Sequence, residues 1–255
     1  MTATFSRIDG SEFKDAERAL RARLTPGLPA ILRLDGRAFH SYCRGLARPY
    51  DSMFMGDMNE TALALAEQVD GVRLAYVQSD EISLLLTDRI DGSEAMQGFM
   101  FGGQIQKLTS ITAAIASSTL NAHRYRVTSQ AIAQFDSRVF QLPDMDAVQR
   151  YFEWRQADAR VNSLGMLASA HFSHKQLHGV STADRADMLR GIGVDPDALP
   201  PAFVHGRVVR REPVEKQTTF FDRRLGADRT VGFIRQQAFV DVAPSFAEGL
   251  DEGWF

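Results

Sequence analysis

The segment AYVQSDEISLLL, residues 75–86, contains two apolar runs that are separated by three polar residues, Ser79, Asp80 and Glu81. Each run has the length and composition of a buried strand. Burying an unpaired carboxylate costs free energy, so the two acids do not belong inside a strand. The segment therefore predicts two strands joined by an acidic turn.

The simplest interpretation of this turn is structural, because Ser and Asp are ordinary turn residues. The turn lacks the Gly and Asn that tight two-residue hairpins prefer. A second acid favours a functional interpretation: Asp35 ends another strand-like run, AILRLDG (30–36), and lies 80 − 35 = 45 residues before Asp80. In a β-α-β-β arrangement, the end of the first strand and the hairpin turn can lie side by side in one sheet.

Two neighbouring carboxylates repel each other unless a proton or a cation relieves the repulsion. Oxygen ligands suit a hard divalent ion such as Mg²⁺, with phosphate completing the coordination shell. Two such ions activate an attacking oxygen and stabilise a leaving oxygen in phosphoryl or nucleotidyl transfer. This arrangement is the palm of polymerases and nucleotide cyclases. The run DGRAFH (35–40) leaves the strand through Gly36, so the backbone N–H groups of residues 37–40 are candidates for phosphate contacts.

The order of elements indicates an α+β fold, with a polymerase- or cyclase-like palm of antiparallel sheet and flanking helices, followed by a helical C-terminal part. Helices are expected over 13–24, 51–71, 94–124, 144–160, 162–178 and 181–192, and strands over 30–36, 73–77, 82–86 and 135–143, and near 203–211, 217–222 and 230–242. With 255 residues, the chain suits one large domain or a compact core with appendages. We divide it into a palm-like catalytic core (1–143), a helical region that completes the domain (144–212) and a C-terminal extension of unknown role (213–255).

Composition narrows the class of protein. Cys43 is the only cysteine, so no intramolecular disulfide and no cysteine-based zinc site can form. The formal net charge of −3 argues against a surface coated in positive charge but is compatible with a local basic groove for nucleic acid. The first residues lack the apolar core of a signal peptide, and no apolar run approaches ~18 residues. We expect a soluble cytoplasmic protein with no membrane contact.

A histidine cluster is a second candidate site. His171, His174 and His178 have the spacing i, i+3 and i+7, which would place them on one face of the helix expected over 162–178. Such a face suits metal, yet no Cys or acid within the cluster completes a zinc site. An ordinary helix surface or core is the simpler interpretation, and a role facing RNA is the third.

Five segments occur in this order along the chain: LRLDGRAFHSY, ARPYD, AYVQSDEISLLL, FDSRVFQLP and WRQADARVNSL. Together they resemble the tRNA-histidine guanylyltransferase family, and more closely its bacterial and archaeal guanylyltransferase-like branch. The resemblance covers roughly residues 5–212. It implies a Mg²⁺-dependent 3′-to-5′ nucleotidyltransferase that adds nucleotides to the 5′ end of tRNA, as in templated repair of truncated 5′ ends. ATP or GTP first activates the 5′-monophosphate, and the 3′-hydroxyl of an incoming nucleoside triphosphate then attacks the activated end. Two Mg²⁺ ions and a homo-tetramer are also implied.

The resemblance assigns roles to individual residues. Metal binding falls on the Asp35 carboxylate, the Gly36 carbonyl and the Asp80 carboxylate. Glu81 joins Asp35 and Asp80 as a catalytic residue, although alternation along a strand points it away from Asp80 and leaves it a supporting role. Arg48 and Asn162 are assigned to substrate activation. The nucleotide is expected to contact Asp35, Gly36, Arg37, Ala38, Phe39, His40, Ser79, Asp80 and Lys107.

The sequence departs from the family pattern in three places. Of the His-Ile-Asn-Asn-Leu-Tyr-Asn run of the eukaryotic members, only Asn162 and Leu164 remain, which favours templated repair over non-templated guanylate addition to histidine tRNA. Arg48 stands where the family usually has lysine, and a planar guanidinium fork is not equivalent to a compact ammonium. Gly103 stands where many members have arginine, which removes one candidate phosphate contact.

Two other functions fit parts of the pattern. A nucleotide or diguanylate cyclase shares the palm and the two acids, but the hairpin here is Gln-Ser-Asp-Glu rather than the Gly-Gly-acid-Glu-Phe of diguanylate cyclases. A catalytically inactive tRNA-binding protein would keep the fold without the chemistry. The presence of both Asp35 and Asp80 argues against an inactive tRNA-binding protein.

Overall fold

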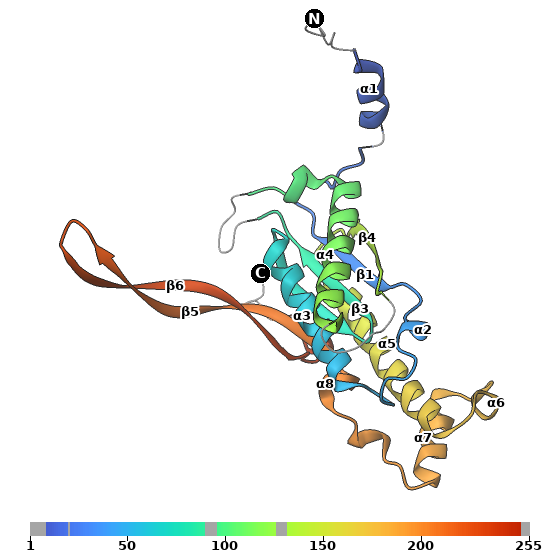
Figure 1. Cartoon of the computed structure of the whole chain (residues 1–255). Coiled ribbons are helices and arrows are strands. Elements are labelled where there is room, and N and C mark those ends of the chain that lie inside the picture. The colour runs from blue at the N-terminus through green and yellow to red at the C-terminus, as the bar shows by residue number, and fades with distance from the viewer. Residues whose placement is uncertain (1–8, 20, 90–95, 126–131, 251–255) are drawn as a thin grey trace, which may run out of the picture.

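The computed structural model describes residues 9–19, 21–89, 96–125 and 132–250. These residues form an antiparallel sheet with helices on both faces (Figure 1), which confirms the α+β fold. The strand order in the sheet is β4-β1-β3-β2-β5-β6. The strands are β1 (Ala30–Gly36), β2 (Val72–Gln78), β3 (Glu81–Leu86), β4 (Phe135–Gln141), β5 (Arg207–Asp222) and β6 (Ala227–Val242).

Helices connect and flank these strands, and none of them in the described ranges is both long and apolar enough to cross a membrane. The α-helices are α1 (Ser11–Ala19), α2 (Phe39–Tyr42), α3 (Ser52–Gln68), α4 (Ile105–Tyr125), α5 (Met145–His171), α6 (His174–Leu177), α7 (Thr182–Gly191) and α8 (Pro201–Val204). Short 3₁₀ turns are η1 (Met100–Gly103), η2 (Pro196–Ala198) and η3 (Phe246–Glu248).

The central strands are buried on both faces of the sheet. Helices α3 and α4 cover one face, where they pack on Leu32, Leu34 and Leu84. Helix α5 and the turn η3 cover the other face, where Phe152 packs in a cluster with Ile31. A strand with apolar neighbours on both sides has no polar face, which explains why these segments read as continuous apolar runs rather than as alternating ones.

Two helices, α1 and α4, do not have the limits expected from the sequence. The helix predicted over 94–124 begins only at Ile105, because Phe101 and Gly102 take left-handed φ angles of 56° and 58° that an α-helix does not allow. The helix predicted over 13–24 ends at Ala19. The residues after α1 instead pair through their backbone with the residues just before α4. Arg23 forms a bridge with Gln104, and Leu24 N donates a hydrogen bond to Gly103 O.

The C-terminal half also differs from its prediction. The two helices expected over 144–160 and 162–178 are one continuous helix, α5, which ends at His171 and is followed by the short α6. The strand pieces expected after residue 203 form a single long hairpin of β5 and β6. The start of β5 pairs with β2 from Val77↔Arg207 to Ala75↔Val209, so this hairpin extends the sheet of the predicted catalytic core.

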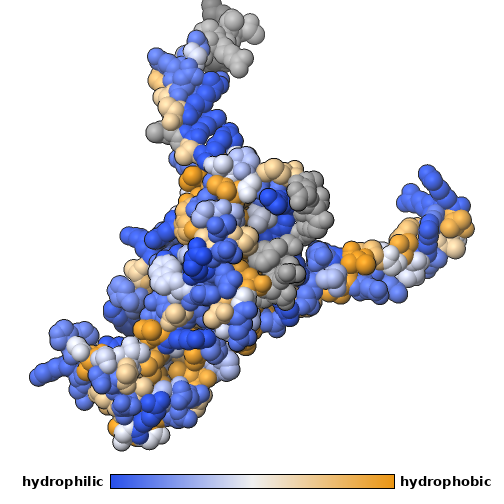
Figure 2. All heavy atoms as spheres, turned by 180° about the vertical axis from the view of Figure 1, so that it is seen from behind, coloured by the Kyte–Doolittle hydropathy of each residue, from blue (hydrophilic) through white to orange (hydrophobic). Residues whose placement is uncertain are grey.

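The β5–β6 hairpin leaves the body of the protein as a twisted two-stranded ribbon (Figure 1). Its base is buried, with Val208 and Val209 each 1% exposed. Beyond the base, both faces of the ribbon meet solvent, and apolar side chains remain visible along it (Figure 2). The exposed apolar residues of this ribbon include Phe220, Phe221, Leu225, Phe233 and Ile234.

Candidate functional site

The end of β1 lies beside the turn between β2 and β3, as the β-α-β-β order predicts. Asp35 is paired with Glu81 in the antiparallel register of β1 and β3. The N–H of Gly36 donates to the carbonyl oxygen of Asp80 at 3.1 Å, which ties the strand end to the turn. Two acids that are 45 residues apart in sequence, Asp35 and Asp80 (80 − 35 = 45), are thereby brought to one edge of the sheet.

The two carboxylates interact electrostatically. Burial raises the pKa of the Asp80 carboxyl above its ordinary value, and the negative charges of Asp35 and Glu81 raise it further. Burial also raises the pKa of the Cys43 thiol to about 11, with a contribution from the charge of Asp80. A positive charge placed between the two carboxylates would stabilise the ionised form of both.

The turn itself adopts a strained conformation. Ser79 has a φ of +46°, a left-handed value that suits glycine better than serine. Strain of this kind is retained where the surrounding structure holds the backbone in place. Here the turn closes the hairpin between Gln78 and Glu81 and exposes the side chain of Ser79 next to Asp80.

The segment after Asp35 turns at once into the short helix α2. A Cβ at Gly36 would lie 2.4 Å from the ring of Phe39, so glycine is required for this close approach. Phe39 is 3% exposed and stacks on Tyr42, so its side chain belongs to the core and does not face a nucleotide. Ala38 precedes α2 with a left-handed φ of 57°.

Among the residues expected at the phosphates, the side chains of Arg37, Ala38 and His40 are exposed. The backbone N–H of Arg37 donates to Gln134 O at 2.8 Å, and its Nη1 donates to Gln134 Oε1. In this structure the N–H of Arg37 is used by the segment that precedes β4, so a phosphate contact of Arg37 would fall to its side chain.

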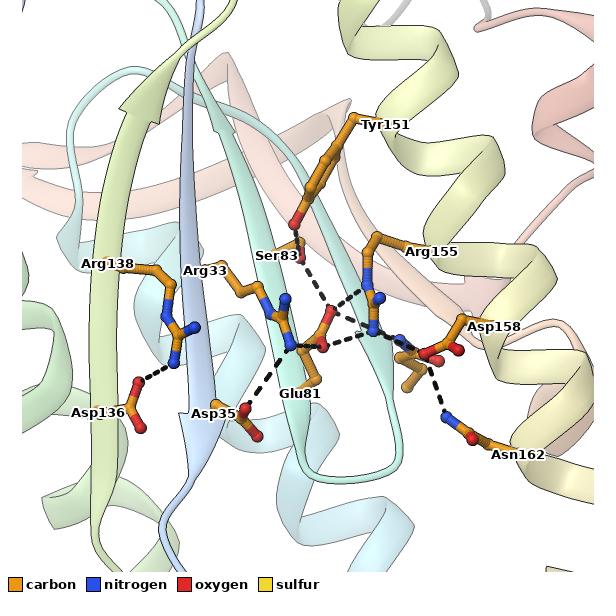
Figure 3. A network of polar contacts seen from close by, with 11 residues as sticks. Arg33, Asp35, Glu81, Ser83, Asp136, Arg138, Tyr151, Arg155, Asp158 and Asn162 are labelled. Atoms are coloured by element: carbon orange, nitrogen blue, oxygen red, sulfur yellow. Dashed lines mark hydrogen bonds and ion pairs between the residues drawn. The ribbon is translucent and has the colours of Figure 1, made fainter. Parts of the chain in front are cut away.

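Glu81 points toward Arg155 of α5, on the face of the sheet that also carries Arg33 (Figure 3). Its Oε1 accepts from Arg155 Nε and its Oε2 from Arg155 Nη2, both at 2.7 Å. Arg33 Nη2 lies 2.8 Å from the same Oε2 and 3.6 Å from Asp35 Oδ2. Both carboxylate oxygens of Glu81 are thus occupied by guanidinium groups.

The network continues on both sides of Glu81 (Figure 3). Ser83 hydrogen-bonds to Tyr151 at 2.8 Å, and Arg155 also binds Asp158 at 3.1 Å. Asn162 donates to Asp158 at 3.3 Å, which places this predicted activation residue within reach of the network, with its side chain exposed.

Sequence reasoning missed the roles of Arg33 and Arg155. For Arg33, the available signal was a charged residue inside the apolar run AILRL. For Arg155, it was a charged residue on the buried face of a helix. A buried cation of this kind needs an acid as its partner. Without the fold, Glu81 was not identifiable as that partner.

Two other candidates lie in exposed positions. Arg48 is exposed in the loop between α2 and α3. Lys107 is exposed in the first turn of α4, near the ring of Phe101. Ser117, which accepts from the N–H of Phe135 at the Asp35 end of the sheet, is 117 − 107 = 10 residues further along α4, about 15 Å along the helix axis. Within one chain, the structure does not bring Lys107 together with the two acids.

The residues present at the turn fit a hard divalent cation. They offer carboxylate oxygens from Asp35 and Asp80 and a backbone oxygen from Gly36, and a bound cation would offset the burial and the neighbouring negative charges that raise the pKa of Asp80. No group of three or more His, Cys, Asp and Glu side chains that could hold a metal occurs in the described part of the chain. Such a site would take its remaining ligands from water and phosphate, which is the usual coordination of Mg²⁺ in nucleotide enzymes.

The histidine cluster does not have the geometry expected for it. His171 ends α5, and the helix breaks before His174 begins α6, so the three residues do not share one helical face. The rings of His174 and His178 lie 6.1 Å apart, and all three side chains are exposed.

Comparisons of the sequence and of the fold with known proteins find similar proteins of one kind. A family model described as tRNAHis guanylyltransferase matches residues 10–143. A "Probable tRNA(His) guanylyltransferase" of Drosophila melanogaster is 26% identical over 206 residues, which is 75% of this chain and 70% of that protein. A solved bacterial tRNA(His) guanylyltransferase-like protein in complex with ATP has a TM-score of 0.80 and 32% identity, and the match covers 94% of both chains. A bacterial guanylyltransferase-like protein in complex with GTP has a TM-score of 0.70 and 29% identity, covering 94% of this chain and 93% of that one.

Proposed function

Because this chain belongs to the tRNA-histidine guanylyltransferase family, we propose that it is a 3′-to-5′ nucleotidyltransferase that adds nucleotides to the 5′ end of tRNA. The observation that carries the proposal is the placement of Asp35 beside Asp80 at the end of β1, with the pKa of Asp80 raised. The bacterial neighbours are complexes with ATP and GTP, which supports one of these nucleotides as the activator of the 5′ end.

The chemistry is divided between the chain and its bound ions. Two Mg²⁺ ions, when bound, supply the positive charge that activates the attacking oxygen and stabilises the leaving phosphate oxygens. Asp35 and Asp80 would hold these ions with their carboxylates, together with the backbone oxygen of Gly36. Ser79 presents its hydroxyl to the triphosphate from the exposed side of the turn.

Other residues orient the substrates. Arg37 and His40 follow Asp35 within five residues and have exposed side chains, so we assign them to contacts with phosphate oxygens. Arg48 binds the activating triphosphate, and Asn162 contributes from α5. Lys107 lies at the opposite end of α4, so its contact with a nucleotide requires a second copy of the chain.

We propose templated repair rather than guanylate addition to one tRNA. Only two positions remain of the family run that follows WRQAD, namely Asn162 and Leu164. A site that holds only triphosphate and sugar does not distinguish bases, so selection falls to pairing with the opposing strand.

The test is extension of a tRNA that lacks its first 5′ nucleotide, with each of the four bases in turn on the opposing 3′ strand. We expect each nucleoside triphosphate to be added preferentially opposite its complement. Asp35→Asn and Asp80→Asn should each lower turnover by several orders of magnitude with an unchanged circular dichroism spectrum. Guanylate addition at similar rates opposite all four bases would refute templating. Formation of a cyclic product from GTP without RNA would identify a cyclase instead.

We further propose that the enzyme acts as a homo-tetramer in the cytoplasm. The resemblance to the family supports the tetramer, and a tRNA substrate supports the location. The exposed apolar side chains of the β5–β6 hairpin are compatible with burial between chains.

A further inference from the structure

The buried carboxylate of Glu81 lies one residue after Asp80, yet its contacts are made with another part of the fold. The side chain is 7% exposed, and neither oxygen is free. Arg155 binds both oxygens in a bidentate manner, which fixes direction as well as distance. Glu81 is therefore held by α5 and is not available as a ligand of a metal at the turn.

The contacts of Glu81 reach both acids of the candidate metal site. Through the backbone, Glu81 is bonded to Asp80, whose carbonyl accepts the N–H of Gly36. Through its side chain, it binds Arg33, whose Nη2 also lies 3.6 Å from Asp35. A shift of the Glu81 carboxylate would therefore move the turn and would also change the ion pair that Asp35 makes.

Arg155 is the member of this network that comes from outside the sheet. It is 5% exposed, and its guanidinium lies over the ring of Trp154 at 4.6 Å and binds Asp158 at 3.1 Å. These two contacts are made within α5, so they orient the guanidinium independently of Glu81. A planar guanidinium with both sides engaged is a rigid support for a carboxylate.

We propose that Arg155 is a positioning residue that, through Glu81, sets the relative placement of Asp35 and Asp80 and thereby the affinity for divalent cations. This inference rests on the proposed function, because it assumes that the two acids bind metal. Residues that orient the ligands of a metal commonly change its affinity 10- to 100-fold when they are replaced, which sets the expected scale at roughly tenfold or more.

The experiment is a titration of Mn²⁺ by electron paramagnetic resonance, in the presence of a non-hydrolysable GTP analogue, on the full chain. Arg155→Lys keeps the charge and removes the bidentate fork. We expect its dissociation constant for Mn²⁺ to rise by about tenfold, and excess Mg²⁺ to restore much of its turnover. The matched control is Arg138→Lys, which changes the exposed ion pair with Asp136 on the neighbouring strand and should leave Mn²⁺ binding unchanged.

If Arg155→Lys does not fold, the double variant Glu81→Gln with Arg155→Gln removes both charges of the buried pair together and leaves Arg33 with Asp35 as its acidic partner. It should show the same loss of Mn²⁺ affinity. A variant that melts at lower temperature but binds Mn²⁺ as tightly as the wild type would overturn the positioning role alone. Absence of Mn²⁺ binding in the wild type, or binding that survives Asp35→Asn, would overturn the proposed metal site as well.

Discussion

At the scale of single residues, Asp80 is where stability and function oppose each other. Its pKa is raised by burial and by the charge of Asp35, so ionising it costs more free energy in the folded chain than in the unfolded one. Natural proteins commonly keep destabilising groups at active sites, and replacing such a group raises stability while it lowers activity. The same carboxylate that is unfavourable without metal is the one that metal binding would stabilise.

We therefore expect Asp80→Asn to raise the melting temperature of the metal-free protein at neutral pH. The folded-state pKa lies above the unfolded value of about 3.9, so the penalty is absent below the unfolded pKa, grows as pH rises from there to the folded-state pKa, and is fully present above it. The difference between variant and wild type should consequently be small near pH 4 and largest at neutral pH. Thermal melts in EDTA between pH 4 and pH 8 measure it. A lower melting temperature for the variant at pH 7.5 would show that the carboxylate is already compensated.

Arg48 provides a second prediction at this scale. Substrates that already carry a 5′-triphosphate need no activation, whereas 5′-monophosphate substrates do. If Arg48 binds the activating triphosphate, Arg48→Ala should slow the 5′-monophosphate substrate far more than the 5′-triphosphate one. Single-turnover rates on the two tRNAs measure this ratio, with Arg44→Ala, an exposed arginine of the same loop, as control. Equal losses on both substrates would assign Arg48 to extension or to structure.

How far the sequence predicted single residues depends on what each residue contacts. Asp35 and Asp80 were identifiable because each follows an apolar strand, and the strand order alone brings them together. The partners of Glu81 were not identifiable, because Arg33 and Arg155 meet it only through the packing of α5 on the sheet. Periodicity gives the face of a side chain but not which of several cations lies opposite it.

At the scale of elements, α5 is the helix that closes the second face of the sheet. Its buried positions include Phe152 at 0% exposure, which packs against the rings of Tyr76 and Phe246. The sequence predicted helix here but divided it at residue 161, within the mostly polar stretch DARVNS (158–163). The continuous α5 follows from burial on the sheet at one end and on α7 at the other.

We expect Phe152→Ala to lower the free energy of unfolding by about 3–5 kcal/mol, since the sheet and η3 cannot collapse into the space of a deleted ring. Urea denaturation followed by circular dichroism measures the change. Trp154→Ala on the exposed side of the same helix is the comparison, because Trp154 is 55% exposed. A loss below about 1 kcal/mol for Phe152→Ala would mean that η3 does not pack there in solution.

The β5–β6 hairpin is the element whose length was least predictable. Strand-like pieces were visible in the sequence, but their pairing over sixteen residues on each side rests on register rather than composition. We expect deletion of residues 214–235, with Pro213 and Gln236 joined through an Asn-Gly turn, to leave the melting temperature within about 2 °C. The removed part contributes no residue to the hydrophobic clusters of the described chain. Thermal melts test this, and a drop of about 10 °C or more would show that the ribbon supports the body.

At the scale of the whole molecule, the outline is extended rather than round. Helix α1 stands away from the body with no buried residue, and the hairpin projects from another side (Figure 1). Both carry exposed apolar side chains, including Phe13 at 65% and Ile234 at 70%. Large exposed apolar groups on projecting elements are typical of surfaces that contact another molecule.

We expect sedimentation velocity at micromolar concentration to give a mass four times that of the chain. Phe221→Ser combined with Ile234→Ser should lower this mass, because both side chains are exposed and apolar on the hairpin. Thr219→Ser, a polar exchange on the same ribbon, should leave the mass unchanged. A monomer for the wild type would contradict the tetramer, and an unaltered tetramer for the double variant would place the contact elsewhere.

The ion pair between Glu81 and Arg155 also has a consequence for the order in which the chain is made. During synthesis, β1, β2 and β3 leave the ribosome long before α5, because residue 86 precedes residue 155 by 155 − 86 = 69 positions. Until α5 arrives, Glu81 has Arg33 alone as its cationic partner on that face, and Ile31 and Leu85 remain uncovered. A nascent chain of residues 1–143 therefore contains the whole predicted palm, but one apolar face of its sheet is still exposed. Docking of α5 neutralises the carboxylate and covers most of the apolar face, which η3 completes, so we expect a nascent chain released at residue 143 to be retained by chaperones rather than to fold.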